Sequence, residues 1–423
     1  MIFWRLGYRL LLWLLLPWLL LHLWWRGRRQ PDYRENIPER FGWYQGKSER
    51  PVIWLHAVSV GETRAAEPLV RALATRYPGH ELLLTQMTPT GRETARQLFG
   101  GMATIVYVPY DYPGAVTRFL ERFKPRLGIL METEIWFNLV ESCARLGIPL
   151  VLANARLSER SARGYALVAP LTHAALGSLA AVSAQTREDA ERLARLGARD
   201  VEVTGNLKFD VAVAPQLLVL GGQLKQWIGQ RPVLLAASTR QGEEELVVDA
   251  FLRIRIEGLL LLLVPRHPQR FDEVAALLTK RNLSFLRRSE QRALPLDCRV
   301  LLGDSMGEMP AYYAACDLAF IGGSLLPYGG QNLIEACAVG RPLLFGHHMY
   351  NFAEASRMAV AAGAAIEVAD AAMLAERAAA LLADRAALTR MSQAALAFSR
   401  AHQGATACNL AICERLLLAA VIK

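Results

Sequence analysis

Short apolar runs alternate with helix-like stretches along most of this chain, and that alternation constrains the fold more than any other feature. The first series of runs comprises residues 52–58, 82–86, 104–108, 127–131, 150–153, 180–183 and 201–204. The second comprises residues 233–237, 259–264, 284–287, 300–302, 318–321 and 342–345. Strands that alternate with helices at this rhythm form a parallel sheet covered on both faces. The sequence therefore predicts an α/β protein with two Rossmann-like, doubly wound domains whose ligand crevices face a central cleft.

The length of 423 residues suits two domains and an appendage better than a single core. We expect a membrane anchor at residues 1–29, a first domain at 30–215 and a second domain at 232–423. Residues 216–231, which contain a Gly-Gly pair, are predicted to be the linker. The Ala-rich region 371–422 is predicted to be helical and to complete the second domain.

The amino-terminal segment has the composition of an uncleaved membrane anchor. Residues 10–25 are apolar apart from His22, and five of the nine tryptophans lie in the first 25 residues, as expected for rings at a membrane interface. Because a span needs about 20 apolar residues, a single span and an interfacial helix both stay open. No small-residue site for signal cleavage is present, and arginines on both sides argue against a buried core helix. The arginines at 26, 28 and 29 predict that the following chain is cytoplasmic.

Charge and cysteine usage argue against several classes of function. The net charge is +9, but it falls to +4 without the five arginines of the first 29 residues. This mild excess suits anionic substrates or an anionic lipid surface, and we expect no nucleic-acid partner. The six cysteines form no C-x-x-C pair and fit a reducing cytosol. The sequence has no Asp-x-Asp and no histidine pair in metal-ligand spacing, so we expect no metal site.

Two turns after predicted strands of the second domain have the composition of a nucleotide site. Arg266 and His267 follow the run 259–264. After the run 300–302, Pro310 is placed to open a helix, whose first backbone N–H groups can bind an anion.

A third such turn follows the run 318–321. It contains two Gly-Gly pairs, and glycines let a phosphate approach the backbone. Asn332 and Glu335 then share one face of the helix expected next, where a carboxylate can accept both ribose hydroxyls. A glycine after a strand is often only a tight connection, but three such turns at strand ends predict a nucleotide-binding edge.

In the first domain, Glu62 follows the run 52–58 and lies at the start of a predicted helix. It could cap the helix and stabilise its dipole by ~0.5–1 kcal/mol. It could equally act as a general base that removes a proton from an acceptor hydroxyl. The spacing alone does not decide between the two.

A second pair of acidic residues, Glu132 and Glu134, follows the run 127–131. On an extended chain these side chains project to the same side. Carboxylates packed together repel, so one is protonated or matched by a cation, or the group is a salt-bridge network that only orders the site. The candidate cations are Arg156, Arg160 and Lys208.

Seven stretches match motifs of one known family. They are His-Ala-Val-Ser-Val-Gly-Glu (56–62), Met-Glu-Thr-Glu-Ile-Trp (131–136), Asn-Ala-Arg-Leu-Ser-Glu-Arg-Ser (154–161), Gly-Asn-Leu-Lys-Phe-Asp (205–210), Pro-Arg-His-Pro (265–268), Met-Gly-Glu-Met (306–309) and the Gly-Gly-Gln-Asn segment that ends at Asn-Phe (351–352). Over essentially its whole length the chain thereby resembles the Kdo transferases, which have the glycosyltransferase-B (GT-B) fold. It departs from them at Gln331, where His is expected, and at Cys337, near where many members carry Pro-Ala.

The resemblance implies an inverting glycosyltransferase of lipopolysaccharide core biosynthesis. It would move 3-deoxy-D-manno-octulosonic acid (Kdo) from CMP-Kdo to the lipid A precursor, lipid IVA. CMP-Kdo is then a co-substrate, and no cofactor is expected. The protein would lie at the bacterial inner membrane with its catalytic domains on the cytoplasmic side. The number of Kdo residues added and the oligomeric state stay open.

The resemblance also implies roles for individual residues. Glu62 is the general base, and Glu132 and Lys208 stabilise the transition state. The implied CMP-binding residues are Pro265, Arg266, Met306, Gly307, Glu308, Asn332, Leu333, Ile334 and Glu335. Arg156 and Arg160 are candidate contacts to phosphates of the acceptor.

Two other functions are consistent with parts of this pattern. A membrane-bound GT-B transferase could use a UDP-sugar on a lipid acceptor, and competition between CMP and UDP would separate the two. A non-catalytic nucleotide-sugar-binding protein should lack a carboxylate placed like Glu62.

Overall fold

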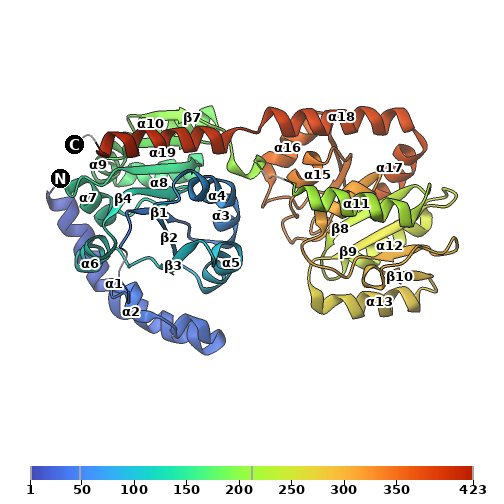
Figure 1. Cartoon of the computed structure of the whole chain (residues 1–423), viewed down its shortest axis with the longest axis horizontal. Helices are drawn as coiled ribbons and strands as arrows, with labels where there is room; N and C mark the ends of the chain where they lie inside the picture. Colours follow the sequence, from blue (N-terminus) through green and yellow to red (C-terminus); the bar gives the residue numbers. More distant parts are fainter. Residues whose placement is uncertain (1, 47–48, 211–212, 422–423) are drawn as a thin grey trace. The chain divides into compact units, whose positions relative to one another are not determined.

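The computed structural model describes residues 2–46, 49–210 and 213–421 (Figure 1). The chain forms two compact units. The first comprises Met1–Asp210 together with Gln403–Lys423, and the second comprises Val211–His402.

The first unit is built on a parallel seven-stranded sheet of order β3-β2-β1-β4-β5-β6-β7. Its strands are β1 (Val52–His56), β2 (Glu81–Gln86), β3 (Ala103–Tyr107), β4 (Pro125–Met131), β5 (Leu150–Ala155), β6 (Ala181–Ala184) and β7 (Val201–Val203). The strand order reverses between β1 and β4, and ligands of open α/β sheets bind at such a switch point.

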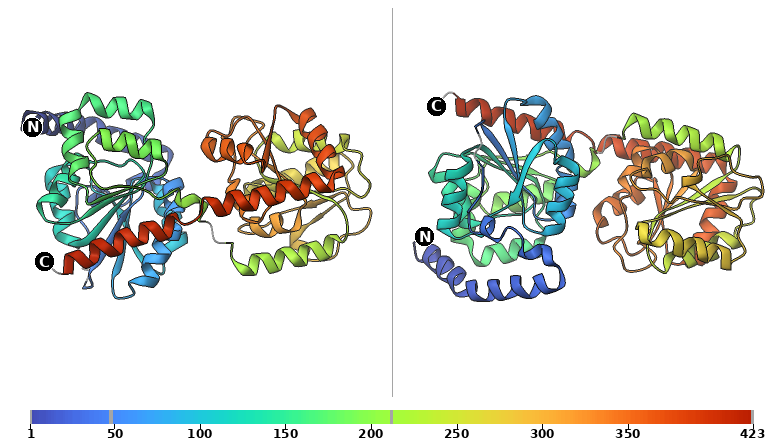
Figure 2. Two further views of the ribbon diagram at one scale, coloured as in Figure 1. Left: turned by 90° about the horizontal axis from the view of Figure 1, so that it is seen from above. Right: turned by 60° about the horizontal axis from the view of Figure 1, so that its bottom comes forward.

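Helices cover both faces of this sheet, as Figures 1 and 2 show. They are α3 (Val60–Ala65), α4 (Glu67–Arg76), α5 (Pro89–Phe99), α6 (Pro113–Phe123), α7 (Phe137–Arg145), α8 (Glu159–Leu167), α9 (Ala169–Gly177) and α10 (Arg187–Arg195). Because successive side chains of a strand point to opposite faces, β1 sends Trp54 into one core cluster and Ile53 and Leu55 into the other. Apolar residues on both faces explain why these strands read as continuous apolar runs.

The second unit repeats this plan with a parallel sheet of order β10-β11-β9-β8-β12-β13-β14. Its strands are β8 (Val233–Thr239), β9 (Leu260–Pro265), β10 (Phe285–Arg287), β11 (Val300–Leu302), β12 (Leu318–Ile321), β13 (Leu343–Gly346) and β14 (Ala365–Val368). Its helices are α11 (Pro215–Ile228), α12 (Glu243–Arg253), α13 (Phe271–Lys280), α14 (Met309–Ala315), α15 (Ile334–Ala338), α16 (Ala353–Ala361), α17 (Ala371–Ala383) and α18 (Arg385–Ala401). The predicted α/β, doubly wound fold class is confirmed. Every predicted strand is present within two residues of its expected bounds, and only β14 had not been predicted.

The segment predicted as a linker is instead a helix of the second unit. Residues 215–228 form α11, which packs closely against α14. At Gly221 a Cβ would lie 2.5 Å from Ala314 Cβ and 2.9 Å from the Ala311 carbonyl oxygen, so the Gly-Gly pair marks a close helix contact. The residues predicted to be the linker, 216–231, therefore lie within the second unit and not between the two units.

The two neighbouring glycines of α11 give a matched test of this contact. Gly221→Ala is expected to lower the free energy of unfolding by about 1–3 kcal/mol, because the added methyl overlaps α14. Gly222→Ala is expected to raise it by up to about 1 kcal/mol, because nothing lies within 4 Å of its Cβ and alanine favours the helix. Chemical unfolding measures both values. Equal effects of the two substitutions would contradict the packing described here.

The sequence predicted that the whole Ala-rich region 371–422 belongs to the second domain, but residues from Gln403 onwards belong to the first unit. Helix α19 (Ala405–Val421) packs on the first sheet, where Ala405, Ile412, Cys413 and Leu417 are buried in its core cluster. The carboxylate of Asp210 accepts hydrogen bonds from the backbone N–H groups of Gly404 and Thr406 at the start of this helix. Residues 403–423 therefore complete the first unit.

The amino-terminal segment is one helix, α1 (Ile2–Arg29), which lies along one side of the first unit in Figures 1 and 2. Leu12, Leu16 and Leu19 pack on a small cluster around Tyr110 and Tyr112. Much of the rest of the helix surface is apolar and exposed, including at least 44% of each of Trp4, Trp13, Trp18, Trp24 and Trp25. By length and composition this helix could anchor the protein in a membrane.

Candidate active site

The candidate catalytic base lies at the carboxyl end of β1. Ser59 caps the start of α3, and its Oγ accepts the N–H of Glu62 at 3.3 Å. Glu62 as a whole is 8% exposed, and its carboxylate accepts hydrogen bonds from the N–H of Val58 and the hydroxyl of Ser59, both at 2.8 Å. Glu62 therefore does cap the helix, but its carboxylate is also fixed at the edge of the sheet where β1 and β4 meet.

The surroundings of Glu62 favour the protonated carboxyl group. Burial, together with the charges of Glu132 and Glu134, raises the pKa of Glu62 to about 7, against the opposing effect of the Val58 and Ser59 hydrogen bonds. A group with a pKa near 7 suits general-base catalysis at neutral pH, because it is a stronger base than an ordinary carboxylate and about half of it is still ionised. The geometry and the electrostatics of this carboxyl group therefore fit a base.

Glu132 directly follows β4 on the other side of the switch point. Its φ of 56° turns the chain, so the prediction that Glu132 and Glu134 lie on an extended segment is wrong. A left-handed conformation costs energy in any residue other than glycine and is often found at functional sites. Of the three candidate cations, Lys208 pairs with Glu132, with 3.6 Å between Nζ and Oε1.

Glu134 is oriented by an aromatic neighbour. The indole N–H of Trp136 donates to its carboxylate at 2.9 Å. The pKa of Glu134 is raised, mainly by burial and also by Glu132, while the Trp136 hydrogen bond opposes the shift. The structure thus brings together Glu62, Glu132, Glu134 and Lys208.

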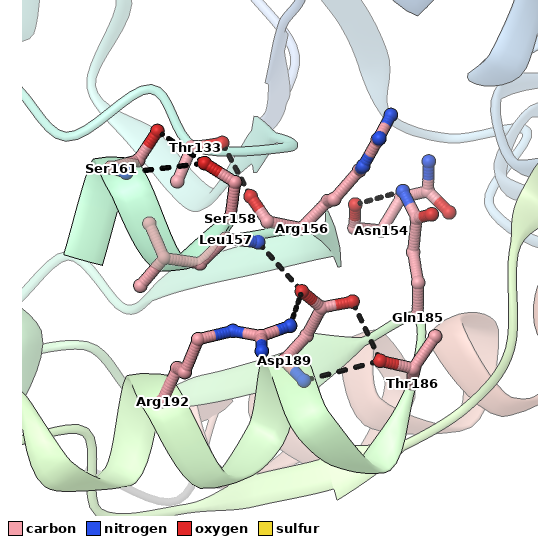
Figure 3. A network of polar contacts seen from close by, with 10 residues as sticks. All are labelled: Thr133, Asn154, Arg156, Leu157, Ser158, Ser161, Gln185, Thr186, Asp189 and Arg192. Carbon is pink, nitrogen blue, oxygen red and sulfur yellow. Dashed lines mark hydrogen bonds and ion pairs between the residues drawn. The ribbon is translucent and has the colours of Figure 1, made fainter. Parts of the chain in front are cut away.

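A buried polar network holds Lys208 in place. Asn154, fully buried with a φ of 54°, accepts the N–H of Leu207 on its side-chain oxygen at 2.9 Å. The side-chain amide of Gln185 donates to the backbone carbonyl of Asn154 at 2.9 Å, as Figure 3 shows. The side-chain oxygen of Gln185 accepts from the Asn206 amide, also at 2.9 Å. Asn206 in turn accepts the N–H of Lys208 at 3.0 Å. These bonds explain why asparagines stand in the motifs 154–161 and 205–210. The third member of the network, Gln185, had not been recognised from the sequence.

A second part of the network fixes the backbone of Arg156 (Figure 3). The hydroxyl of Thr133 donates to the Arg156 carbonyl at 2.7 Å. The next residue, Leu157, donates its N–H to the buried carboxylate of Asp189 at 2.8 Å. The Arg156 side chain itself is exposed and points away from these contacts in Figure 3. Arg160 is likewise exposed, on α8, and neither arginine forms an ion pair with Glu132 in the part of the chain that the structure describes.

In the second unit, two predicted CMP-binding segments leave neighbouring strands at one edge of the sheet. β9 ends at Pro265 and is followed by Arg266. Its neighbour β11 ends at Leu302 and leads into the loop that carries Met306, Gly307 and Glu308.

The side chain of Glu308 is held at the start of α14. It accepts the hydroxyl of Ser305 at 2.6 Å and pairs with Arg288, with 3.2 Å between Oε2 and Nε. Met306, in contrast, is 54% exposed and lies open to a ligand.

The third predicted segment begins α15. The Asn332 amide donates to Glu335 at 2.9 Å and accepts the N–H of Ile334 at 3.0 Å, so it orients the carboxylate expected to bind ribose. Leu333 and Ile334 are buried, which limits their part in ligand binding to the main chain.

The glycine turn after β12 does not offer its N–H groups to a phosphate, contrary to the prediction. The carboxylate of Glu243 accepts the N–H groups of Gly323, Ser324 and Leu325, and also that of Arg240. Glu243 is completely buried, and its pKa is raised by burial against the opposing effect of these four bonds. The Gly-Glu-Glu-Glu run at 242–245 places a carboxylate soon after β8 and could have pointed to this role of Glu243, but it had not been recognised from the sequence.

Within residues 2–46, 49–210 and 213–421 no group of three or more His, Cys, Asp or Glu side chains is arranged to hold a metal ion.

Comparison with known proteins identifies relatives over nearly the whole chain. A family model described as 3-deoxy-D-manno-octulosonic-acid transferase (kdotransferase) matches residues 35–211, and one of glycosyl transferases group 1 matches residues 279–398. A 3-deoxy-D-manno-octulosonic acid transferase of Bordetella pertussis is 45% identical over 411 residues, which cover 93% of this chain and 94% of that protein. The protein of the same name from Haemophilus influenzae is 40% identical over 372 residues, covering 86% and 87%.

Among solved structures, a glycosyltransferase from Rickettsia africae superimposes with a TM-score of 0.56 over 88% of this chain and 99% of its own, at 13% identity, and so shares the fold. The identity to the two relatives, extending over both units and the motifs described above, carries the assignment. This chain belongs to the 3-deoxy-D-manno-octulosonic acid (Kdo) transferase family.

Proposed function

We propose that this protein is an inverting glycosyltransferase that moves Kdo from CMP-Kdo to the lipid A precursor in lipopolysaccharide biosynthesis. The observation that carries the proposal is the buried carboxyl group of Glu62, which lies at the switch point of the first sheet beside Glu132 with a pKa of about 7. Relatives named Kdo transferases at 45% and 40% identity support the choice of sugar.

In the proposed reaction Glu62 accepts the proton of an acceptor hydroxyl as its oxygen attacks the anomeric carbon of Kdo. A new C–O bond forms on one face of the sugar while the bond to the phosphate oxygen breaks on the other. The electron pair leaves with CMP, and the configuration at the anomeric carbon inverts. Lys208, held by Glu132 and the asparagine network, is placed to stabilise the charge that develops during transfer.

The donor is proposed to bind on the second unit at the edge where β9 and β11 end. Arg266 would contact the phosphate, and the loop 306–308 would approach it through its backbone. Glu335, oriented by Asn332, would accept the ribose hydroxyls. These contacts involve no metal or other cofactor.

The acceptor is proposed to bind on the first unit, which also carries the anchor helix. The locked backbone and open side chain of Arg156 suit a contact with a phosphate of the lipid head group, with Arg160 as a second cation nearby in sequence. With α1 in the bacterial inner membrane and both units on the cytoplasmic side, the enzyme would meet its lipid at the membrane surface.

The pKa of Glu62 gives a prediction for the pH dependence of transfer. Because the base must be deprotonated, kcat is expected to rise with pH around a midpoint of about 7 and to level off about one pH unit higher. Glu134→Gln is expected to move the midpoint to lower pH, because it removes a charge that raises the pKa of Glu62. Initial rates measured over about two pH units on either side of this pKa give both midpoints. A rate that does not change across this range would contradict the assignment of the base.

The function itself is tested by mass spectrometry of lipid IVA after incubation with the protein and CMP-Kdo. We expect a product heavier by one or more Kdo residues. A product formed only with UDP-sugars, or displacement of the donor by UDP but not by CMP, would replace this proposal by the alternative donor class.

A further inference from the structure

One side of α1 is docked on the first unit along much of the length of the helix. The less exposed residues of α1 recur every three or four positions from Arg5 to Leu23, and this spacing makes one stripe on a helix. Within this stripe, the leucines at 12, 16 and 19 pack on Tyr110 and Tyr112 of the first unit. Contacts with the unit therefore extend deep into the apolar segment 10–25.

Hydrogen bonds fix this side of the helix at two further points. The hydroxyl of Tyr8 donates to the buried carboxylate of Asp111 at 2.8 Å. The hydroxyl of Tyr112 donates to the backbone carbonyl of Leu12, which lies inside the apolar segment, at 2.6 Å. Because polar groups find no water in the hydrocarbon core, a helix that crosses the bilayer could not keep these partners on a folded domain.

The charges at both ends of the apolar segment leave it short for a span. Arg9 and Arg26 enclose residues 10–25, which are 16 residues, whereas a helix needs about 20 to cross the hydrocarbon core. Arg9 is also held on the first unit, since its Nη2 lies 3.4 Å from Oε2 of Glu141. Arg5 pairs with the same carboxylate, with 2.8 Å between Nη1 and Oε1. The segment therefore cannot be lengthened at this end without breaking both ion pairs.

The tryptophans of α1 are spread along the helix and do not gather at its ends. In a spanning helix, tryptophans lie at the two levels of the lipid head groups. Trp13 and Trp18, near the middle of α1, are 58% and 60% exposed, and a crossing would carry them into the hydrocarbon. A helix in the plane of the membrane keeps every ring at the head-group level. α1 contains no Asp or Glu, and its exposed Arg26 and Arg28 suit anionic head groups.

We propose that α1 lies in the plane of the membrane, within the cytoplasmic leaflet alone, and that its exposed apolar surface binds lipid while its other side stays docked on the first unit. The partner of this surface is a bilayer with anionic head groups. Because the helix is held along its length, it fixes how the first unit is oriented on the membrane. This inference rests on the membrane location proposed above, but not on the identity of the sugar or the nucleotide.

The side on which the amino terminus lies distinguishes an in-plane helix from a spanning one. A short polar tag with one cysteine is added before residue 1 of the full-length protein, in which Cys408→Ser removes an exposed native thiol. In spheroplasts, a membrane-impermeant maleimide is expected to label the tag only after the inner membrane is opened, as it labels Cys408 of the untagged protein. The untagged Cys408→Ser variant gives the background. Labelling of the tag in intact spheroplasts would show a crossing and overturn the proposal.

A double-mutant cycle tests whether α1 stays docked when it binds lipid. Tyr8→Phe and Asp111→Asn are combined, and Tm is measured on the full-length protein bound to vesicles of phosphatidylethanolamine and phosphatidylglycerol. Because residues in contact have non-additive effects, the double variant is expected to lose less in Tm than the two single variants together. Tyr33→Phe is the control, since the Tyr33 hydroxyl accepts from Arg26 at the surface, and its effect should add to that of Asp111→Asn. Additive losses for Tyr8 would mean that the helix leaves the unit in lipid, and would contradict the proposal.

Failure of this inference is distinguishable from failure of the proposed function. If the tag is periplasmic but the protein adds Kdo to lipid IVA, the in-plane position is wrong and the function stands. If the protein does not float with the vesicles, the proposed membrane location is wrong, and the in-plane position with it. If the helix lies in the plane but no Kdo is transferred, the proposed function is wrong and the position of α1 stands.

Discussion

Glu62→Gln is expected to lower kcat for Kdo transfer by about 10²–10⁴-fold, the usual contribution of a general base. Glutamine has nearly the same shape, and its carbonyl oxygen can still accept the N–H of Val58, so the cap of α3 is kept. What is lost is the ability to take up a proton. Binding of CMP is expected to stay unchanged, because the proposed donor contacts lie on the second unit.

Initial rates with saturating CMP-Kdo and lipid IVA measure the loss, and calorimetry with CMP measures the donor site. Glu67→Gln is the matched control, since Glu67 is also in the first turn of a helix of the same unit but pairs at the surface with Arg71. Transfer that stays within about tenfold of the wild-type rate would remove Glu62 from the role of base.

The largest expected effect on stability is that of Glu243→Ala. The substitution leaves four backbone N–H groups without their acceptor, three of them in the turn after β12, in a place with no access to water. Each unsatisfied buried group costs about 1–3 kcal/mol, so the second unit should lose about 4 kcal/mol or more. For a unit of this size, that corresponds to a drop of about 10 °C in its Tm.

Differential scanning calorimetry of the full-length protein measures this drop. Glu245→Ala is the control, two residues further along the same helix and exposed. If both variants unfold at the same temperature, the carboxylate of Glu243 does not hold the turn.

The sequence predicted the sheets well because their strands are buried on both faces and read as uninterrupted apolar runs. β14 was missed because its central residues Ile366 and Glu367 are not fully buried, so the strand does not read as an apolar run. The position of Glu62 followed from its place soon after a strand, and Lys208 was one of three candidate cations until the family resemblance gave it a role.

Other contacts near the proposed donor site depend on the order of strands, which periodicity does not reveal. Arg240 and His267 are 27 positions apart and meet only because β8 and β9 are neighbours. Glu243 similarly reaches a turn about 80 residues away because β8 pairs with β12. The Ala-rich composition of region 371–422 predicts helices, but not that α19 covers the first sheet and not the second.

The return of α19 to the first sheet has a consequence for how the protein is made. The second unit is one continuous segment that interrupts the first, so it can fold as soon as it has left the ribosome. The first unit cannot, although all its strands emerge earlier, because Ile412, Cys413 and Leu417 of its core follow the whole second unit in the chain. Its apolar surface stays partly uncovered until these residues have been synthesised, so the unit that is begun first is completed after the second.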